Sequence, residues 1–198
     1  MSDPGSHEGR RRYVLAIIGY AGGLEASIEA LCVELGRAAV TAGFRIVTGG
    51  LGGVMEAVSR GAHDAPSFRE GDVIGVLPGY DRSAANPYVD VVIPTGMQIG
   101  RNVILVAMAD VVLAIGGGAG TLSELAVAWQ LGKPILTLAS TGGWGERLAG
   151  ERLDARRDDP VHSAATPGEA ITLALALAER RGPDSGEIGS NWKKTRPT

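Results

Sequence analysis

Residues 111–124 read VVLAIGGGAGTLSE, in which a short apolar run leads into a cluster of glycines and then into a helical pattern. Glycines also close the apolar runs at residues 14–18, 44–48 and 135–139, so the pattern occurs four times. Short, non-alternating apolar strands separated by helices are typical of a parallel sheet with helices on both faces. The sequence therefore predicts an α/β fold, namely a single Rossmann-like, three-layer domain with a doubly wound parallel sheet.

The remaining elements and the domain bounds follow from the same patterns. Helices are predicted at residues 24–42, 53–62, 99–109, 121–131 and 166–180, and two further strands at residues 73–77 and 89–93. The last helix begins with TPGE, which places Thr, Pro and Glu where a helix N-terminus uses them. We expect the domain to span residues 12–180 and the segments 1–11 and 181–198 to be flexible.

The predicted helix at residues 99–109 contains the segment VILVAMA, residues 103–109, which has no polar face. One side of such a helix is expected to cover the sheet, so the other side is expected to meet more protein. This predicts a homo-oligomer, either a dimer or a tetramer.

Composition argues against several classes of protein. The chain has 19 Lys and Arg, 22 Asp and Glu, a net charge of −3 and 5% aromatic residues, which disfavours nucleic-acid binding. No apolar run approaches the roughly 18 residues of a membrane span. Cys32 is the one cysteine, so we expect no disulfide, no metal site and a cytoplasmic location. Arginines 10–12 before an apolar run resemble a secretory signal, but the amphipathic pattern that follows favours a first strand.

The glycine clusters follow the strands at the expected carboxyl edge of the sheet, where open parallel sheets bind ligands. TGGLGGVMEA at 48–57 and GGGAGTLSE at 116–124 both connect a strand to a helix. Unpaired N–H groups and the positive end of the helix dipole converge at such a helix start, which suits a phosphate. A single cluster also fits an ordinary turn, but two at one edge favour an anion or nucleotide site.

Other familiar motifs do not fit. GGGAGTLSE lacks the third glycine of G-x-G-x-x-G, and a glycine rather than an acid follows the second strand, which disfavours NAD. The chain has no Walker lysine and no G-x-S-x-G, and its three histidines are scattered. Triad hydrolysis and metal catalysis are therefore unsupported.

Two charged residues, Arg101 and Glu124, are expected near the ligand edge because each lies near the beginning of a predicted helix. A buried Arg and carboxylate beside a phosphate loop suit the cleavage of an N-glycosidic bond. Each residue also has a simpler interpretation. TLSE also matches a capping box, in which the Glu124 carboxylate accepts a hydrogen bond from a backbone N–H at the helix start. The simpler interpretation of Arg101 is an ion pair on the protein surface.

GGGAGTLSE closely resembles the PGGxGTxxE motif of the LOG-like superfamily, whose members are often labelled lysine decarboxylases. The sequence at 48–62 is similar to the first glycine motif of that family, and the resemblance covers roughly residues 12–178. Characterised LOG proteins are phosphoribohydrolases that release the base from cytokinin riboside 5′-monophosphates. The resemblance assigns catalysis to Arg101 and Glu124.

Two departures from the motif keep a second function open, because Gly116 stands where the motif has Pro and Asn102 stands where Lys follows the Arg. The segments IGRN, GGGAGTLSE and TGGW look closer to a neighbouring branch that includes the molybdenum-cofactor carrier proteins, in which the loops bind a pterin phosphate without turnover. The residues that the motifs assign to ligand binding are Gly19, Gly49, Gly50, Gly52, Gly53, Asn102, Gly117, Gly118, Ala119, Gly120 and Thr121.

We therefore expect a protein that binds a small phosphorylated ligand, either nucleotide-like or a pterin, with a phosphoribohydrolase as the alternative. The expected ligand is a nucleoside monophosphate or the molybdenum cofactor, and no further cofactor is required. Lysine decarboxylation is not expected, because PLP chemistry needs a lysine at the site and Lys133 lies at the amino edge of the sheet. Trp144 either stacks on the ligand or fills a loop, and Glu56 either contacts the ligand or interacts with a helix dipole.

Overall fold

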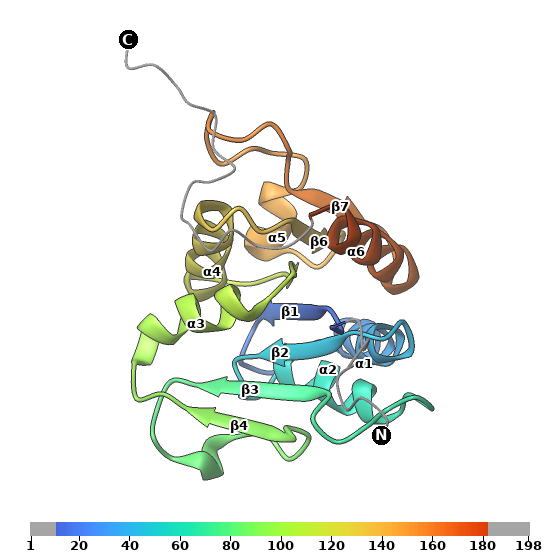
Figure 1. Cartoon of the computed structure of the whole chain (residues 1–198), viewed down its shortest axis with the longest axis vertical. Helices are drawn as coiled ribbons and strands as arrows, with labels where there is room; N and C mark the ends of the chain where they lie inside the picture. Colours follow the sequence, from blue (N-terminus) through green and yellow to red (C-terminus); the bar gives the residue numbers. More distant parts are fainter. Residues whose placement is uncertain (1–10, 182–198) are drawn as a thin grey trace, which may run out of the picture.

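Seven parallel strands form the sheet of this protein, whose computed structural model describes residues 11–181 (Figure 1). The strand order is β4-β3-β2-β1-β5-β6-β7. The strands are β1 (Val14–Gly19), β2 (Arg45–Thr48), β3 (Val73–Leu77), β4 (Val91–Pro94), β5 (Val111–Ile115), β6 (Ile135–Leu138) and β7 (His162–Ala164). The helices of this part of the chain are α1 (Ala26–Thr41), α2 (Val54–His63), α3 (Arg101–Met108), α4 (Ala119–Gln130), α5 (Gly143–Leu148) and α6 (Pro167–Arg181).

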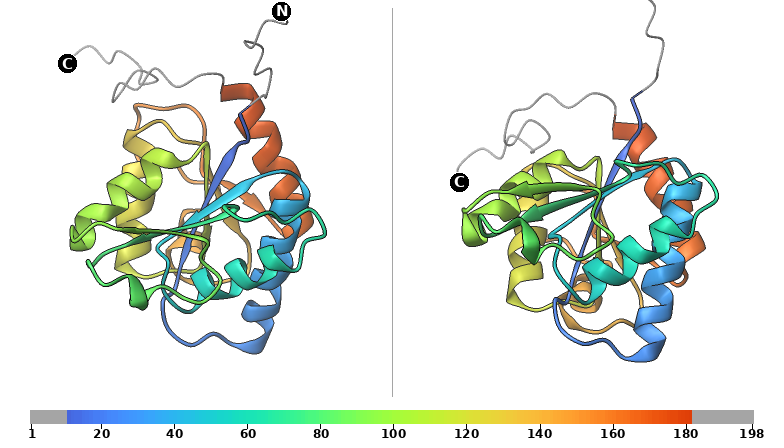
Figure 2. Two further views of the ribbon diagram at one scale, coloured as in Figure 1. Left: turned by 60° about the horizontal axis from the view of Figure 1, so that its bottom comes forward. Right: turned by 90° about the horizontal axis from the view of Figure 1, so that it is seen from below.

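Two hydrophobic cores lie on opposite faces of the sheet because successive residues of a strand point to opposite sides. Leu15 and Ile17 of β1 pack into the core beneath α1, α2 and α6, whereas Ala16 and Ile18 pack into the core beneath α3 and α4. Figure 2 shows the two helix layers on either side of the strands. Since both faces are covered, the central strands are apolar throughout, and the predicted doubly wound α/β fold is confirmed.

The last helix, α6, begins where its sequence predicts. Thr166 Oγ1 accepts a hydrogen bond from the N–H of Glu169 (3.2 Å), and the Glu169 carboxylate accepts one from the N–H of Ala165 (2.9 Å). These two bonds satisfy donors that the first turn of a helix leaves unpaired.

The short strand β7, the helix α5 and a 3-10 turn at Arg82–Ala84 were not predicted from the sequence. The six-residue helix α5 contains two glycines, which are poor helix formers. The helix α4 begins at Ala119, two residues before the predicted start. The terminal segments that we expected to be flexible lie, apart from residues 11 and 181, outside the described residues.

The order of the strands reverses between β1 and β5, since β2 to β4 follow on one side and β6 and β7 on the other. Loops that leave β1 and β5 therefore run to opposite faces of the sheet and leave a crevice between them at the carboxyl edge. This crevice is where the fold is expected to bind a ligand. Within residues 11–181, no helix is both long enough and apolar enough to span a membrane.

Candidate functional site

A cavity of about 280 Å³ lies at the carboxyl edge, where the strand order reverses. Its volume is close to the lower end of small-molecule sites, which begin at about 300 Å³. Residues from the end of β1, from the loops after β1, β2 and β5, and from α2, α3 and α4 surround it. The lining consists of Ile18, Gly19, Tyr20, Ala21, Gly49, Leu51, Met55, Arg101, Asn102, Gly118, Gly120, Thr121 and Glu124.

Arg101 and Glu124 meet in this cavity. Arg101 Nη1 lies 3.0 Å from Glu124 Oε1, and the two side chains are 11% and 9% exposed. Burial raises the pKa of Glu124 to about 7, although the positive charge and hydrogen bond of Arg101 act in the opposite direction. Near neutral pH the Glu124 carboxyl is therefore divided between its protonated and charged forms.

The simpler interpretations of this pair are wrong. Glu124 lies in the second turn of α4 and bonds to Arg101, so it is not the carboxylate of a capping box. The low exposure of both side chains excludes a surface ion pair.

Gly49 makes room for the Arg101 guanidinium. A Cβ atom at position 49 would lie 2.5 Å from Arg101 Nη2 and 2.9 Å from its Cζ, so any larger residue would displace the guanidinium. Gly49 follows β2 and Arg101 begins α3, and the absence of a side chain at 49 lets these segments meet. This glycine therefore positions a charged group instead of only forming a turn.

The N-terminus of α4 forms another part of the cavity wall. Gly118 is the N-cap residue, with an extended backbone, and no side chain caps the helix. The N–H groups of the first helical turn have no acceptor within the helix, and they carry the positive end of the helix dipole. Gly118 and Gly120 both have open space where a Cβ would lie, so the main chain is accessible to a ligand from the cavity.

Asn102 connects α3 to the same turn of α4. Its Nδ2 donates to Ser123 Oγ (2.7 Å), and that hydroxyl donates to the carbonyl O of Gly120 (2.7 Å). Gly100 is the N-cap residue of α3, so Asn102 lies inside the first turn of the helix. Thr121 is buried and its side chain packs against Gly117.

Five of the residues predicted to bind the ligand lie outside the lining of the cavity, namely Gly50, Gly52, Gly53, Gly117 and Ala119. Gly50 packs against the backbone of β3, and Gly53 has a φ of +66° as the N-cap residue of α2. Gly117 has a φ of +96°, a value that favours glycine. The backbone requires glycine at these three positions whether or not a ligand binds, and direct contact of all five residues with a ligand stays a prediction.

Tyr20 is a cavity residue that the sequence reasoning missed. It directly follows β1, and its ring lies against Gly116, where a Cβ would be 2.2 Å from Tyr20 Cε2. Gly116 has a φ of +58°, which proline cannot adopt because its ring fixes φ near −65°. The glycine that stands in place of the motif's proline thus has a structural reason in this chain. The position of Tyr20, immediately after the first strand, was the available signal.

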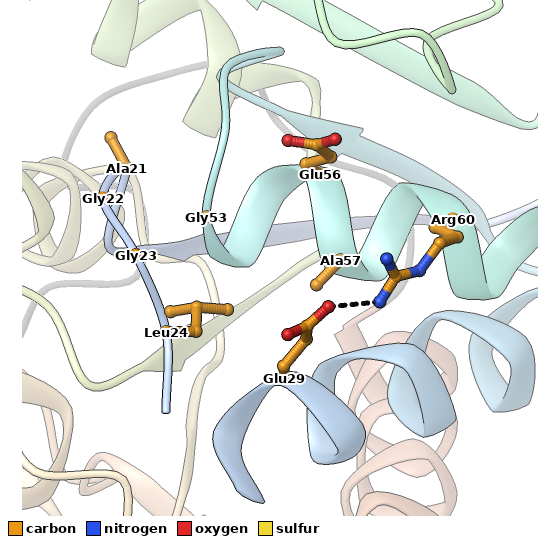
Figure 3. A pocket seen from close by; sticks show the side chains of 9 residues that line it. All are labelled: Ala21, Gly22, Gly23, Leu24, Glu29, Gly53, Glu56, Ala57 and Arg60. Carbon is orange, nitrogen blue, oxygen red and sulfur yellow. Dashed lines mark hydrogen bonds and ion pairs between the residues drawn. The ribbon is translucent and has the colours of Figure 1, made fainter. Parts of the chain in front are cut away.

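A second cavity, of about 350 Å³, lies beside the first and shares Ala21 with it. Figure 3 shows Arg60 of α2 and Glu29 of α1 pointing toward each other, and Arg60 Nη2 lies 2.6 Å from Glu29 Oε1. Glu56 stands on the first turn of α2, as the helix-dipole interpretation expects. Because the Arg60 and Glu29 side chains are 40% and 43% exposed, their attraction is screened by water and contributes little to stability.

Two further residues lie away from the first cavity. Trp144 belongs to α5, and its ring is partly buried against the second core. Its main-chain N–H donates to the carbonyl O of Gly117 (3.0 Å). Lys133 is buried just before β6, at the amino edge, and its Nζ donates to the carbonyl O of Ala107 (3.1 Å). Within residues 11–181, no three His, Cys, Asp or Glu side chains form a metal-binding group.

The fold and the cavity can be compared with known proteins. The model of the SLOG cluster4 family matches residues 12–171. The chain belongs to this family. A relative from rice (Oryza sativa subsp. japonica), the cytokinin riboside 5′-monophosphate phosphoribohydrolase LOG, is 35% identical over 141 residues, which are 66% of this chain and 56% of the rice enzyme. An uncharacterized protein from Archaeoglobus fulgidus is 36% identical over 124 residues, 63% of this chain and 78% of that protein.

Solved structures similar to this SLOG cluster4 protein include two proteins named for the molybdenum cofactor. The carrier protein of Chlamydomonas reinhardtii has a TM-score of 0.71 and 30% identity over 85% of this chain and 99% of its own. The molybdenum cofactor binding protein of Rippkaea orientalis has a TM-score of 0.69 and 29% identity over 84% of this chain and 98% of its own. The predicted membership of the LOG-like superfamily, in a branch near the molybdenum-cofactor carriers, is confirmed.

Proposed function

We propose that this protein binds a small phosphorylated ligand, a nucleotide or a pterin phosphate, in the cavity between β1 and β5. The phosphate lies at the N-terminus of α4, and the rest of the ligand extends toward Arg101 and Glu124. The observation that carries this proposal is the uncapped first turn of α4, which presents its main chain to the cavity at Gly118 and Gly120.

Two further features support the proposal. Arg101 supplies a buried positive charge in the same cavity, and Asn102 holds α3 against the first turn of α4. A site of this kind recognises an anion by main-chain N–H groups and a helix dipole, without a phosphate-binding lysine. The two proteins named for the molybdenum cofactor also match this chain over almost their whole lengths.

A second candidate function is the hydrolysis of nucleoside 5′-monophosphates, and the contact between Arg101 and Glu124 favours it. In that reaction water attacks C1′ of the ribose, the bond from C1′ to the base breaks, and the base leaves with the electron pair and takes a proton. The Glu124 carboxylate would accept the proton of the attacking water and stabilise the positive charge that develops on the sugar. Arg101 would orient Glu124, and the products are the free base and ribose 5-phosphate.

Calorimetric titration tests the binding proposal. The titrants are adenosine 5′-monophosphate, a phosphorylated pterin and the unphosphorylated form of each. We expect at least one phosphorylated compound to bind and its unphosphorylated form to bind much more weakly. Equal binding of both forms, or binding of neither phosphorylated compound, would contradict the proposal. Chromatography of the same mixtures separates the two functions, since a hydrolase releases free base and a binding protein does not.

The variant Gly118→Asp tests where the phosphate lies. Position 118 has open space for a side chain, and aspartate at an N-cap position accepts hydrogen bonds from the first turn, so the fold should be retained. The new carboxylate occupies the N–H groups and repels the phosphate, so affinity should fall at least about tenfold. Gly118→Ala and Gly168→Asp are the controls, because the first adds no charge and the second adds the charge to the first turn of α6.

We also propose that the protein is a homo-oligomer that associates through α3 and the segments beside it. The exposed large apolar side chains of α3 and of the segments that precede it are Tyr80, Val91, Met97, Ile99 and Val103. Exposed apolar surface of this kind marks an interface when it is contiguous. Sedimentation of the wild type should show a dimer or tetramer that Ile99→Lys dissociates. A monomeric wild type would refute the proposal.

A further inference from the structure

We infer that Tyr20 is the residue on which the ring system of the ligand stacks, and that it selects ligands with a flat base or pterin over ligands that offer only a sugar phosphate. This inference rests on the proposed function, because it assigns the second half of the ligand to a side chain of the same cavity. The glycine motifs of the sequence do not include this residue.

Two contacts hold Tyr20 in place, one through its main chain and one through its ring. The carbonyl O of Tyr20 accepts a hydrogen bond from the N–H of Val54 (2.9 Å), which fixes the main chain of Tyr20 against the first residue of α2. The ring rests on Gly116, where a Cβ would lie 2.2 Å from Cε2 and 3.0 Å from Cζ. The absence of a side chain at 116 thus lets the ring lie directly on the loop that follows β5.

The remaining surface of the ring is available to a ligand. Tyr20 is 38% exposed, and it is the one aromatic residue in the lining of the cavity. The other exposed large apolar side chains of residues 11–181 belong to the segments from Tyr80 to Val103, away from the lining. Stacking of a flat ligand on an exposed aromatic ring is favourable, because it removes apolar surface of both from water.

The position of the ring also fits the size of the ligand. Gly116 lies two residues before Gly118, so the Tyr20 ring and the N-terminus of α4 belong to one wall of the cavity. Arg101 and Glu124 line the same cavity. A ligand with its phosphate on α4 and its base on Tyr20 therefore has its sugar, or the linker of a pterin, within the space that these two residues also line.

Titration of ligand pairs tests the inference. Adenosine 5′-monophosphate and a phosphorylated pterin contain a flat ring system, whereas ribose 5-phosphate offers the phosphate and sugar alone. Stacking of a base on an aromatic side chain corresponds to roughly 5- to 150-fold in affinity. We expect Tyr20→Leu to lower the affinity for the two ring compounds by such a factor and to leave the affinity for ribose 5-phosphate unchanged. Tyr20→Phe keeps the ring and should bind like the wild type.

The controls separate this inference from the proposed function. Tyr88→Leu removes a half-buried tyrosine that lies outside both the cavity lining and the proposed oligomer interface. This variant should bind every compound as the wild type does, and the melting temperature of each variant shows that it folds. One outcome is that the wild type binds a phosphorylated ring compound while Tyr20→Leu lowers the affinity for that compound no more than the affinity for ribose 5-phosphate. In that case the inference is wrong and the proposed function stands. If the wild type binds none of the three compounds, the proposed function itself fails.

Discussion

Replacing Glu124 by Gln should change how the stability of the protein depends on pH, in the direction opposite to that expected for an ordinary ion pair. The usual carboxylate beside an arginine has a lowered pKa and stabilises the fold above it. The Glu124 carboxyl instead lies in a buried cavity, and desolvation outweighs the attraction of Arg101. The charged form of Glu124 is therefore less favourable in the folded protein than in the unfolded chain.

The magnitude follows from the pKa values in the two states. Burial raises the pKa of Glu124 from its ordinary 4.5 to about 7. Between these values the folded protein binds more protons than the unfolded chain, so the free energy of unfolding falls as the pH rises. One pKa unit corresponds to about 1.36 kcal/mol, which gives a total loss of about 3 kcal/mol between pH 4.5 and pH 8. Most of this loss is complete near pH 7.

Urea denaturation over this pH range measures the effect. The free energy of unfolding of the wild type, minus that of Glu124→Gln, should decrease by about 3 kcal/mol as the pH rises. Glu34→Gln is the matched control, since it removes one exposed carboxylate from α1. A difference that stays constant or increases with pH would refute the reasoning, because Arg101 would then outweigh burial. The same decrease in the Glu34→Gln control would assign the effect to net charge.

Two glycine substitutions give further predictions. Gly49→Ala should displace Arg101 and so raise the pKa of the Glu124 carboxyl further. The same urea denaturation series should then show the loss of unfolding free energy at higher pH than in the wild type. Gly36→Ala should lower the free energy of unfolding by about 1–3 kcal/mol, because the new Cβ would lie 1.9 Å from the carbonyl O of Val58 where α1 crosses α2. Gly168→Ala, with open space in α6, should instead leave stability unchanged or raise it, and thermal unfolding compares the two.

The fold was largely predictable because its central strands are buried on both faces and therefore stand out as apolar runs closed by glycines. The strands β3 and β5 have the predicted bounds, and β1, β2 and β6 differ by one residue at one end. The strand β4 begins two residues later and ends one residue later than predicted. The strand β7 contains His162, Ser163 and Ala164, which give no apolar pattern, and pairing with β6 alone makes it a strand. Such an edge strand depends on tertiary contacts that local sequence does not encode.

The residues of the candidate site that follow a strand could be predicted from the sequence. Arg101, Glu124 and Gly118 follow strands at one edge of a parallel sheet, so their convergence in one cavity follows from topology. The contact of Tyr20 with Gly116 joins residues almost a hundred positions apart and appears only when β1 and β5 lie side by side. The burial that raises the Glu124 pKa is likewise a property of the packed structure.

A crystal structure of the protein with adenosine 5′-monophosphate or a phosphorylated pterin tests the central claim most directly. The account predicts that phosphate oxygens accept hydrogen bonds from main-chain N–H groups at the start of α4, at about 2.7–3.2 Å, with the ring system on Tyr20. A phosphate held elsewhere, such as beside Arg60 in the second cavity, would contradict the account.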